Sequence, residues 1–237
     1  MQYPKIQTIF LRDEQNIIIP DKFTTPEIEY LKNNLFECTE KIDGTNIRIE
    51  VNGTEVTIKG RADNSNIPTH LVEYLQEIFT PEKVLKALNV DPTIGIIATI
   101  YGEGYGYKIQ AAGPNYLKDS VGFILFDINI GNKWWLKRED CESIAQSLNV
   151  PIVPFVGYMT LSEAITFVKS GFKSFIAENK DFNAEGLVLK TPMGLLDRKG
   201  ERLIYKLKTC DFNKWDAAYG NSKEPVIQIP NENLNKE

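Results

Sequence analysis

The sequence predicts an α+β domain built from antiparallel sheets with flanking helices. Strand-like segments come in blocks, and helical segments separate the blocks instead of alternating with single strands. Two turn dipeptides, Asn52-Gly53 and Gly131-Asn132, join neighbouring strand-like segments, and such dipeptides are typical of antiparallel hairpins. The chain has 237 residues, of which 42% are hydrophobic, so it is long enough to bury a sizeable core.

The pattern of apolar residues places the individual elements. Apolar runs or alternating apolar residues predict strands over residues 5–10, 35–41, 46–51, 54–60, 93–101, 121–130, 133–136, 152–158, 185–191 and 202–209. Helical spacing predicts helices over residues 26–34, 68–79, 81–88, 138–148 and 161–170. The first helix is expected to start at Thr25-Pro26-Glu27, because proline and acidic side chains suit a first helical turn. The segment GEGYGYKIQAAGPNY, from Gly102, is expected to be a glycine-rich loop.

The domain organisation is expected to be simple. No linker divides residues 1–210, so we predict one domain over residues 1–211. After Trp215 the composition shifts to Asn, Glu, Lys and Pro, which predicts a polar tail over residues 212–237 without a separate domain.

Composition argues against several classes of protein. The longest apolar runs, such as residues 94–100, are too short to cross a membrane, and the N-terminal residues lack the apolar core of a signal peptide. Three scattered cysteines, Cys38, Cys141 and Cys210, argue against disulfides and zinc, so a cytoplasmic location is expected. The single His70 argues against histidine-based catalysis. A net charge of −5 argues against a protein that coats nucleic acid non-specifically, but it permits a local basic groove. A monomer is the default expectation.

Charged residues interrupt several apolar strand-like segments. Lys41 follows one strand, Glu185 opens another, and Lys206 and Lys208 alternate along LIYKLKT, so the last two share one strand face. Each has a plain structural explanation when taken singly. Asp43-Gly44 after Lys41 matches a surface hairpin, Glu185 matches a turn, and a lysine pair protects an edge strand from aggregation.

Together, the lysines and acids suit a nucleoside triphosphate with its metal ion. Phosphates require cations, and a divalent ion requires carboxylate oxygens such as those of Glu103, Asp127 and Glu185. No GxxxxGK[ST] motif is present, which excludes a P-loop. The segment GEGYGYK is followed by no clear helix, so a dinucleotide-binding fingerprint is not favoured.

Six ordered segments resemble the covalent nucleotidyltransferase superfamily of ATP-dependent DNA ligases, RNA ligases and mRNA capping enzymes. The segment Lys41-Ile42-Asp43-Gly44 fits the KxDG signature of that superfamily. The other matches, in order, are Gly60-Arg61, Tyr101-Gly102-Glu103, Leu125-Phe126-Asp127, Glu185-Gly186-Leu187-Val188 and Tyr205-Lys206-Leu207-Lys208. EKIDGTN looks most like the phage-type RNA ligases of the double-stranded-RNA nick-sealing class. The resemblance implies a nucleotidyltransferase (ATP-grasp-like ligase) fold, with residues 1–211 as the adenylyltransferase domain.

The resemblance also implies a role for each matched residue. Lys41 is expected to carry AMP, and Lys206 and Lys208 to bind the α-phosphate. The expected nucleotide-binding set is Glu40 against the adenine, Asn46 at the phosphates, Arg61 and Glu103 at the ribose and phosphates, and Phe126 stacked on the base. Glu185 and Asp127 are expected to bind the metal. The implied cofactors are ATP and Mg²⁺ (or Mn²⁺), and the implied partner is nucleic acid, either RNA ends or a nicked duplex.

The chemistry of such a site is consistent with these residues. A nucleophilic amine must be neutral, and the charges of Lys206 and Lys208 disfavour the protonated form of Lys41 while stabilising charge on the α-phosphate. The expected reaction has three steps: AMP moves to Lys41, then to a 5′-phosphate, and is released when a 3′-hydroxyl attacks.

Three alternatives stay open at this stage. About thirty residues follow Lys208, too few for the further domains that related ligases and capping enzymes carry, so self-adenylylation is better supported than end joining. A minimal ATP-dependent DNA ligase is the first alternative, and a capping-type guanylyltransferase is more distant. The third is a non-catalytic nucleotide-binding or RNA-end-binding protein. The sequence leaves the preference between RNA and DNA undecided.

Overall fold

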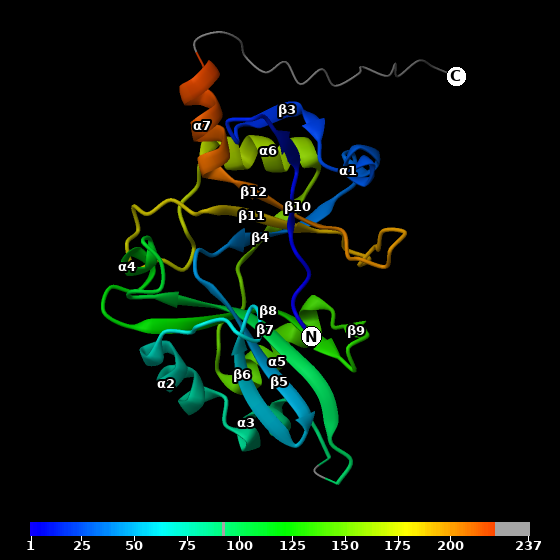
Figure 1. The fold of residues 1–237 in the computed structure, drawn as a ribbon, viewed down its shortest axis with the longest axis vertical. Helices are drawn as coiled ribbons and strands as arrows, with labels where there is room; N and C mark the ends of the chain where they lie inside the picture. Colours follow the sequence, from blue (N-terminus) through cyan, green and yellow to red (C-terminus); the bar gives the residue numbers. More distant parts are fainter. Residues whose placement is uncertain (92, 221–237) are drawn as a thin grey trace.

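The computed structural model describes residues 1–91 and 93–220 and contains two five-stranded sheets within them (Figure 1). The first sheet has the order β1(Gln7–Thr8), β12(Ile204–Lys208), β11(Gly186–Lys190), β4(Phe36–Lys41) and β10(Phe155–Met159). The second has the order β6(Glu55–Gly60), β5(Thr45–Gly53), β7(Ile96–Gly106), β8(Val121–Ile130) and β9(Trp134–Trp135). A small ribbon pairs β2(Phe10–Arg12) with β3(Ile18–Phe23). Apart from β1 with β12, neighbouring strands are antiparallel, which confirms the predicted fold class.

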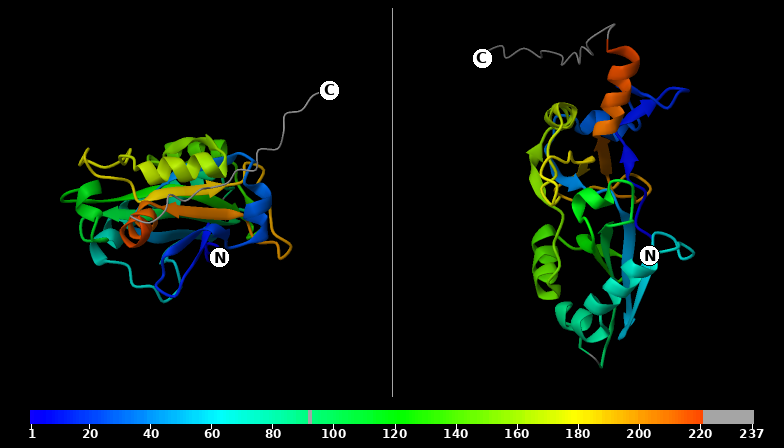
Figure 2. Two further views of the ribbon diagram at one scale, coloured as in Figure 1. Left: turned by 90° about the horizontal axis from the view of Figure 1, so that it is seen from above. Right: turned by 90° about the vertical axis from the view of Figure 1, so that its left-hand side faces the viewer.

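The helices cover the outer surfaces of the two sheets. Those against the first sheet are α1(Pro26–Leu31), α6(Leu161–Ser170) and α7(Thr209–Tyr219), and those against the second are α2(Thr69–Ile78), α3(Pro81–Ala87) and α5(Arg138–Leu148). The short α4(Gly113–Tyr116) packs beside β7. Figure 1 and the right-hand view of Figure 2 show that the two sheets follow one another along the long axis.

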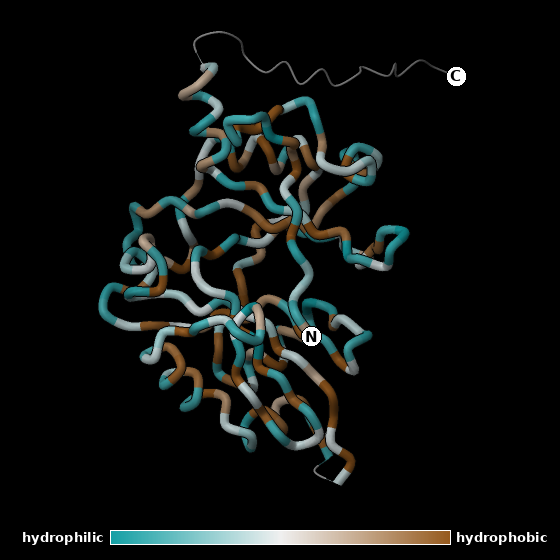
Figure 3. Tube along the Cα trace, in the orientation of Figure 1, coloured by the Kyte–Doolittle hydropathy of each residue, from teal (hydrophilic) through white to brown (hydrophobic). Residues whose placement is uncertain are grey.

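Strand alternation divides the first sheet into an apolar face and a polar face. Its apolar face packs on α6 and carries Phe36, Cys38, Leu187, Leu189, Tyr205 and Leu207. Because successive side chains point to opposite faces, Lys41, Lys206 and Lys208 project from the other side of the sheet. The alternating hydropathy is visible along the strands in Figure 3. The alternation of side chains along β4 and β12 thus places the three lysines on one face of the sheet, away from the apolar core.

The predicted surface hairpin at Asp43-Gly44 is wrong. Strand β4 belongs to the first sheet and β5 to the second, so these residues form a crossover between sheets. Neither residue has a positive φ. A Cβ on Gly44 would collide with the backbone of Gly104 and crowd Glu103, so close approach to β7 requires a glycine here.

The predicted loop beginning at Gly102 is also wrong in its first part, because β7 continues to Gly106. Glycines occur in this strand for packing reasons. A Cβ at Gly102 would collide with the ring of Phe123, and one at Gly104 would crowd Leu71. The predicted hairpins are confirmed, although the first turn centres on Gly53-Thr54, since Asn52 pairs with Glu55.

Two further elements differ from the prediction. Residues 18–23 form β3, which was not predicted. The predicted boundary at residue 211 falls within α7, so residues 212–219 continue a helix whose Phe212 is buried. The rest of the predicted tail, residues 221–237, lies outside the described residues. All three cysteines are free, and none of the helices in the described part is both long and apolar enough to cross a membrane.

Candidate active site

The register of the first sheet brings the predicted lysines together. Gly186 pairs with Lys41 on one side and with Lys208 on the other, so the three residues form one row across β4, β11 and β12. Lys206 lies in the next row of the same face, opposite Val188. A Cβ at Gly186, which has φ 153°, would collide with the carbonyl of Leu207. The middle strand therefore leaves the space between the two outer lysines open.

Glu185 bridges two of these lysines. Its Oε2 lies 2.7 Å from Nζ of Lys41, and its Oε1 lies 2.6 Å from Nζ of Lys208. Both pairs are largely shielded from solvent. One carboxylate thus holds the predicted nucleophile and one predicted phosphate-binding lysine at the same place.

Lys206 and Lys208 differ in their electrostatic environments. Lys206 makes no hydrogen bond or ion pair within the described residues, and burial together with the charges of Lys208 and Lys41 lowers its pKa. Burial also acts to lower the pKa of Lys208, but the hydrogen bond and the charge of Glu185, with smaller contributions from neighbouring groups, together outweigh burial and raise it. Lys206 is therefore the cation of this site that an anion would most stabilise.

Two further carboxylates face the lysines. Burial, reinforced by the charges of Glu185 and Asp43, raises the pKa of Glu103 to about 8, although Lys41 and Arg61 act against the shift. Burial and then Glu185 raise the pKa of Asp43. The sequence prediction omitted Asp43 from the site, although the residue was visible inside the KxDG signature.

Asn46 and Arg61 add groups without protein partners. Asn46 pairs with Glu103 in the β5–β7 register, and its buried Oδ1 accepts no hydrogen bond in the described structure. Arg61 follows the end of β6 and is exposed, and its charge influences Glu103 and Lys206. Both residues therefore have unused hydrogen-bonding capacity near Glu103, and their predicted contacts with a nucleotide stay predictions.

Glu40 occupies a different position from its predicted neighbours. It alternates with Lys41 and so lies on the apolar face of β4, where it is buried. Its Oε2 accepts the backbone N–H of Phe175 at 2.9 Å, while its Oε1 is buried without a partner in the described structure. Burial raises the pKa of Glu40. These contacts favour a role in anchoring the segment around Phe175, and the predicted adenine contact stays a prediction.

Phe126 lies at a β-bulge. Tyr101 pairs with Asp127 and Gly102 with Leu125, so Phe126 is an extra residue on β8. The bulge breaks the simple alternation of side chains along β8. As a result Tyr3 contacts both Phe126 and Asp127: its ring lies 4.9 Å from that of Phe126, and its hydroxyl donates to Asp127 at 2.6 Å. Phe126 is half-buried and packs against two apolar clusters.

Asp127 joins the two sheets. Its Oδ2 lies 2.9 Å from Nζ of Lys190 on β11 and 2.8 Å from Nη1 of Arg202. Burial acts to raise the pKa of Asp127, but the two cations outweigh burial and lower it. Lys190 also donates to the carbonyl of Phe126 at 3.0 Å. These contacts favour a structural role for Asp127, and its predicted role as a metal ligand stays a prediction.

The described residues contain no cluster of three or more His, Cys, Asp or Glu side chains arranged to enclose a metal ion. Magnesium in nucleotide sites is commonly held by one or two carboxylates, phosphate oxygens and water. The charges of Glu185 and Asp43 reach Glu103, and the charge of Glu185 reaches Asp43, so the three carboxylates lie near one another. The donor set therefore fits a hydrated ion delivered with phosphates, and does not fit an all-protein cage.

Comparison with known proteins supports a ligase family. A family model described as RNA ligase matches residues 34–208. Among solved structures, an RNA ligase of Naegleria gruberi is similar: a point variant with ATP and Mn has a TM-score of 0.63 at 20% identity, covering 93% of this chain and 59% of that one. The complex with PPi gives 0.59 at 22% identity, covering 93% and 60%. At these identities the likeness establishes the fold.

In both structural comparisons a larger share of this chain is covered than of the matched ligase. The chain spans about 60% of the length of the Naegleria ligase chains. No curated protein matches the chain.

Proposed function

The chain belongs to the RNA ligase family, and on that premise we propose that it joins a 5′-phosphate to a 3′-hydroxyl, at RNA ends or at a nick, through lysyl-AMP on Lys41. The observation that carries the proposal is the convergence of three lysines and Glu185 on one face of the first sheet. ATP is the proposed nucleotide, as in the Naegleria ligase complex with ATP and Mn.

In the proposed first step, the amine of Lys41 attacks the α-phosphorus of ATP. A P–N bond forms, the bond to the β-phosphate oxygen breaks, and pyrophosphate leaves. Lys206 and Lys208 lie on the same face as Lys41, where their charges would stabilise the developing charge on the α-phosphate. The unpaired state of Lys206 supports this role, because binding a phosphate would relieve the repulsion between the lysines.

The ion pair with Glu185 bears on when Lys41 can react. In the structure the amine of Lys41 donates to Oε2 of Glu185 at 2.7 Å, and it must leave this contact to reach a phosphorus atom. A divalent cation bound with the phosphates near Glu185 would supply positive charge that competes for this carboxylate. We propose that Lys41 becomes reactive only when Glu185 has been drawn away from it.

The remaining residues are proposed to bind and orient the nucleotide. Arg61 would contact phosphate and ribose, the side-chain amide N–H of Asn46 a phosphate oxygen, Glu103 a ribose hydroxyl, and Phe126 the base. In the second step AMP passes to a 5′-phosphate, and in the third a 3′-hydroxyl displaces AMP. The domain proposed to perform the first step comprises residues 1–211.

Incubation with α-labelled ATP tests the proposal. We expect covalent label on the wild type that requires Mg²⁺ or Mn²⁺, and no label on Lys41→Ala. Lys22→Ala, which removes an exposed lysine on β3, is the matched control and should label normally. Label from GTP alone would favour a capping-type reaction, and absence of label from either nucleotide would favour a non-catalytic binding protein.

A further inference from the structure

A fully buried arginine lies behind the segment that carries Arg61. Arg48 on β5 is 1% exposed and is among the largest fully buried side chains in the described structure. Its Nε donates to the carbonyl of Gly60 at 2.8 Å, and its Nη2 donates to Oδ1 of Asp63 at 2.7 Å. The two acceptors precede and follow Arg61 in the chain. The guanidinium group therefore holds this segment on both sides of the proposed nucleotide-binding residue.

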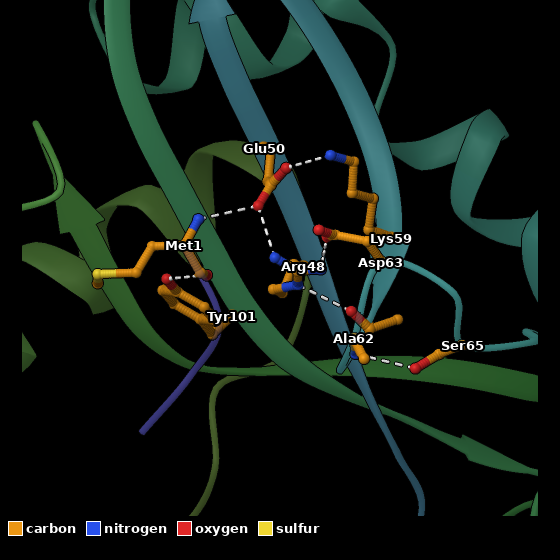
Figure 4. A network of polar contacts seen from close by, with 9 residues as sticks. Met1, Arg48, Glu50, Lys59, Ala62, Asp63, Ser65 and Tyr101 are labelled. Carbon is orange, nitrogen blue, oxygen red and sulfur yellow. Dashed lines mark hydrogen bonds and ion pairs between the residues drawn. The ribbon is translucent and has the colours of Figure 1, made fainter. Parts of the chain in front are cut away.

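The remaining contacts fix Arg48 itself and the turn that follows. Its Nη1 donates to Oε1 of Glu50 at 2.7 Å, and Lys59 pairs with the other oxygen of Glu50 at 2.8 Å. Figure 4 shows these side chains together with Met1, whose amino group also contacts Glu50. Beyond Arg61, the N–H of Ala62 donates to Ser65 at 2.8 Å, which closes the turn.

Nothing in this network touches the reacting groups. Arg61 is exposed and makes no ion pair within the described residues, so the backbone on either side of it is what determines where its guanidinium lies. A planar group with donors in a fixed fork suits this task, and lysine offers no equivalent geometry. Burying a charged side chain is costly unless it is paired and hydrogen-bonded, and the three nitrogens of Arg48 reach three separate acceptors at once, which the single nitrogen of lysine cannot match in the same geometry.

We propose that Arg48 is a positioning residue for ATP, acting through Arg61 by holding Gly60 and Asp63. This inference rests on the proposed function only for its catalytic consequence. The physical claim, that Arg48 immobilises residues 60–63, stands apart from the reaction. Displacing a substrate-binding group by about 1 Å typically costs up to about 100-fold in rate.

The variants separate positioning from folding. Asp63→Ala removes one acceptor whose side chain is mostly exposed, so the fold should persist. Asp63→Asn keeps the acceptor oxygen and should rescue the defect. Arg48→Lys keeps the charge and loses the fork. Asp21→Ala, which removes an exposed carboxylate on β3 outside this network, is the control expected to keep wild-type kinetics.

The kinetic arm measures KM for ATP and kcat in AMP transfer to Lys41. We expect Asp63→Ala and Arg48→Lys to raise KM by about 10-fold or more. Combined with Arg61→Ala, each should add little further loss, because its effect passes through Arg61. A loss that multiplies fully with that of Arg61→Ala, or wild-type KM in both single variants, would overturn the proposal.

The second arm measures amide hydrogen exchange of residues 61–65 and does not depend on activity. Exchange should accelerate in Asp63→Ala and Arg48→Lys while β7 stays protected, and Asp63→Asn should restore protection. Unchanged exchange would refute the immobilising role. If the wild type forms no AMP adduct, the proposed function fails, and the exchange arm then decides alone whether Arg48 holds the segment.

Discussion

The amine of Lys41 lies 2.7 Å from Oε2 of Glu185, and the second oxygen of the same carboxylate holds Lys208. Lys206, in the adjacent row of the sheet, has no such partner in the described structure. Because of this asymmetry, we expect replacements of Lys206 and Lys208 to change stability in opposite directions.

Replacing Lys206 with methionine should stabilise the free protein and slow adenylylation. Folding lowers the pKa of Lys206, so its charged form is disfavoured in the native state, and the resulting destabilisation is present at neutral pH and disappears above the unfolded pKa. Lys206→Met removes that charge and keeps the apolar stem. We expect the melting temperature to rise by about 2 °C and the rate of labelling to fall by about 10²-fold.

Lys208→Met should have the opposite effect on stability. Its pKa is raised by Glu185, so it contributes stability at neutral pH that is lost as pH rises through the folded pKa. We expect the melting temperature to fall by about 2 °C, with a similar loss of labelling. Thermal melts of both variants without nucleotide provide the measurement, and shifts of the same sign would contradict the asymmetry.

The stability of the free protein should fall as pH rises toward the pKa of Glu103. That pKa, about 8, lies above the ordinary value of 4.5, so between these pH values the native state binds more protons than the unfolded state. The stability contributed by the protonated carboxyl is therefore complete below pH 4.5 and is lost as pH rises to 8. The melting temperature of Glu103→Gln should match that of the wild type at low pH. As pH rises toward 8, it should exceed the wild-type value by a growing margin. Melts in chelator, from pH 5 upward, test this; parallel curves would contradict it.

Phe126 is expected to contribute both to the core and to nucleotide binding. Phe126→Ala loses the ring contact with Tyr3 and should cost about 1–3 kcal/mol of unfolding free energy. Phe126→Leu retains most of the apolar volume but provides no aromatic face. If Phe126 stacks on adenine, the leucine variant should keep most of its stability and still raise KM for ATP. An unchanged KM in a stable leucine variant would assign Phe126 to the core alone.

Asp127→Asn decides between the predicted metal role of Asp127 and the structural role that its contacts favour. The variant leaves the buried cations of Lys190 and Arg202 without a counter-charge, and breaking such a pair typically costs about 3–5 kcal/mol. We expect a much lower melting temperature, with an unchanged Mg²⁺ requirement for labelling at low temperature. A stable variant that needs far more Mg²⁺ would support the metal-ligand prediction.

Which side chains share a strand face was easier to predict from the sequence than how the strands connect. Alternation along LIYKLKT was sufficient to place Lys206 and Lys208 on one face, because that rule is local. The hairpin at Asp43-Gly44 failed because the dipeptide reports only local turn preference, whereas the strands on either side join different sheets. That pairing depends on residues far apart in the chain.

Side chains with long-range partners were the hardest to predict. Lys190 lies against Asp127, 63 positions earlier in the sequence, and nothing beside Lys190 in the chain indicates this contact. The bulge at Phe126 likewise depends on the partner strand β7 and has no local signal. Asp43, in contrast, was visible within the KxDG signature and could have been included in the site.

The last prediction concerns the polynucleotide. A net charge of −5 provides little general attraction for phosphates, so contact with a nick should depend on local cations such as Lys206, Lys208 and Arg61. Binding should therefore weaken steeply as salt increases. The 2′-hydroxyl is the group by which a protein distinguishes RNA from DNA, and the family assignment favours RNA.

A nick with a ribonucleotide at its 3′-hydroxyl end should be sealed faster than the same nick made entirely of DNA. Pre-adenylylated nicks provide the measurement, because they bypass the first two steps and isolate the attack of the 3′-hydroxyl. A Lys41→Ala variant serves as the control. It should still seal these substrates, because the proposed transfer of AMP through Lys41 is not needed when AMP is already on the strand. Equal or faster sealing of the all-DNA nick would assign the chain a DNA substrate while leaving the proposed roles of Lys41, Lys206 and Lys208 unchanged.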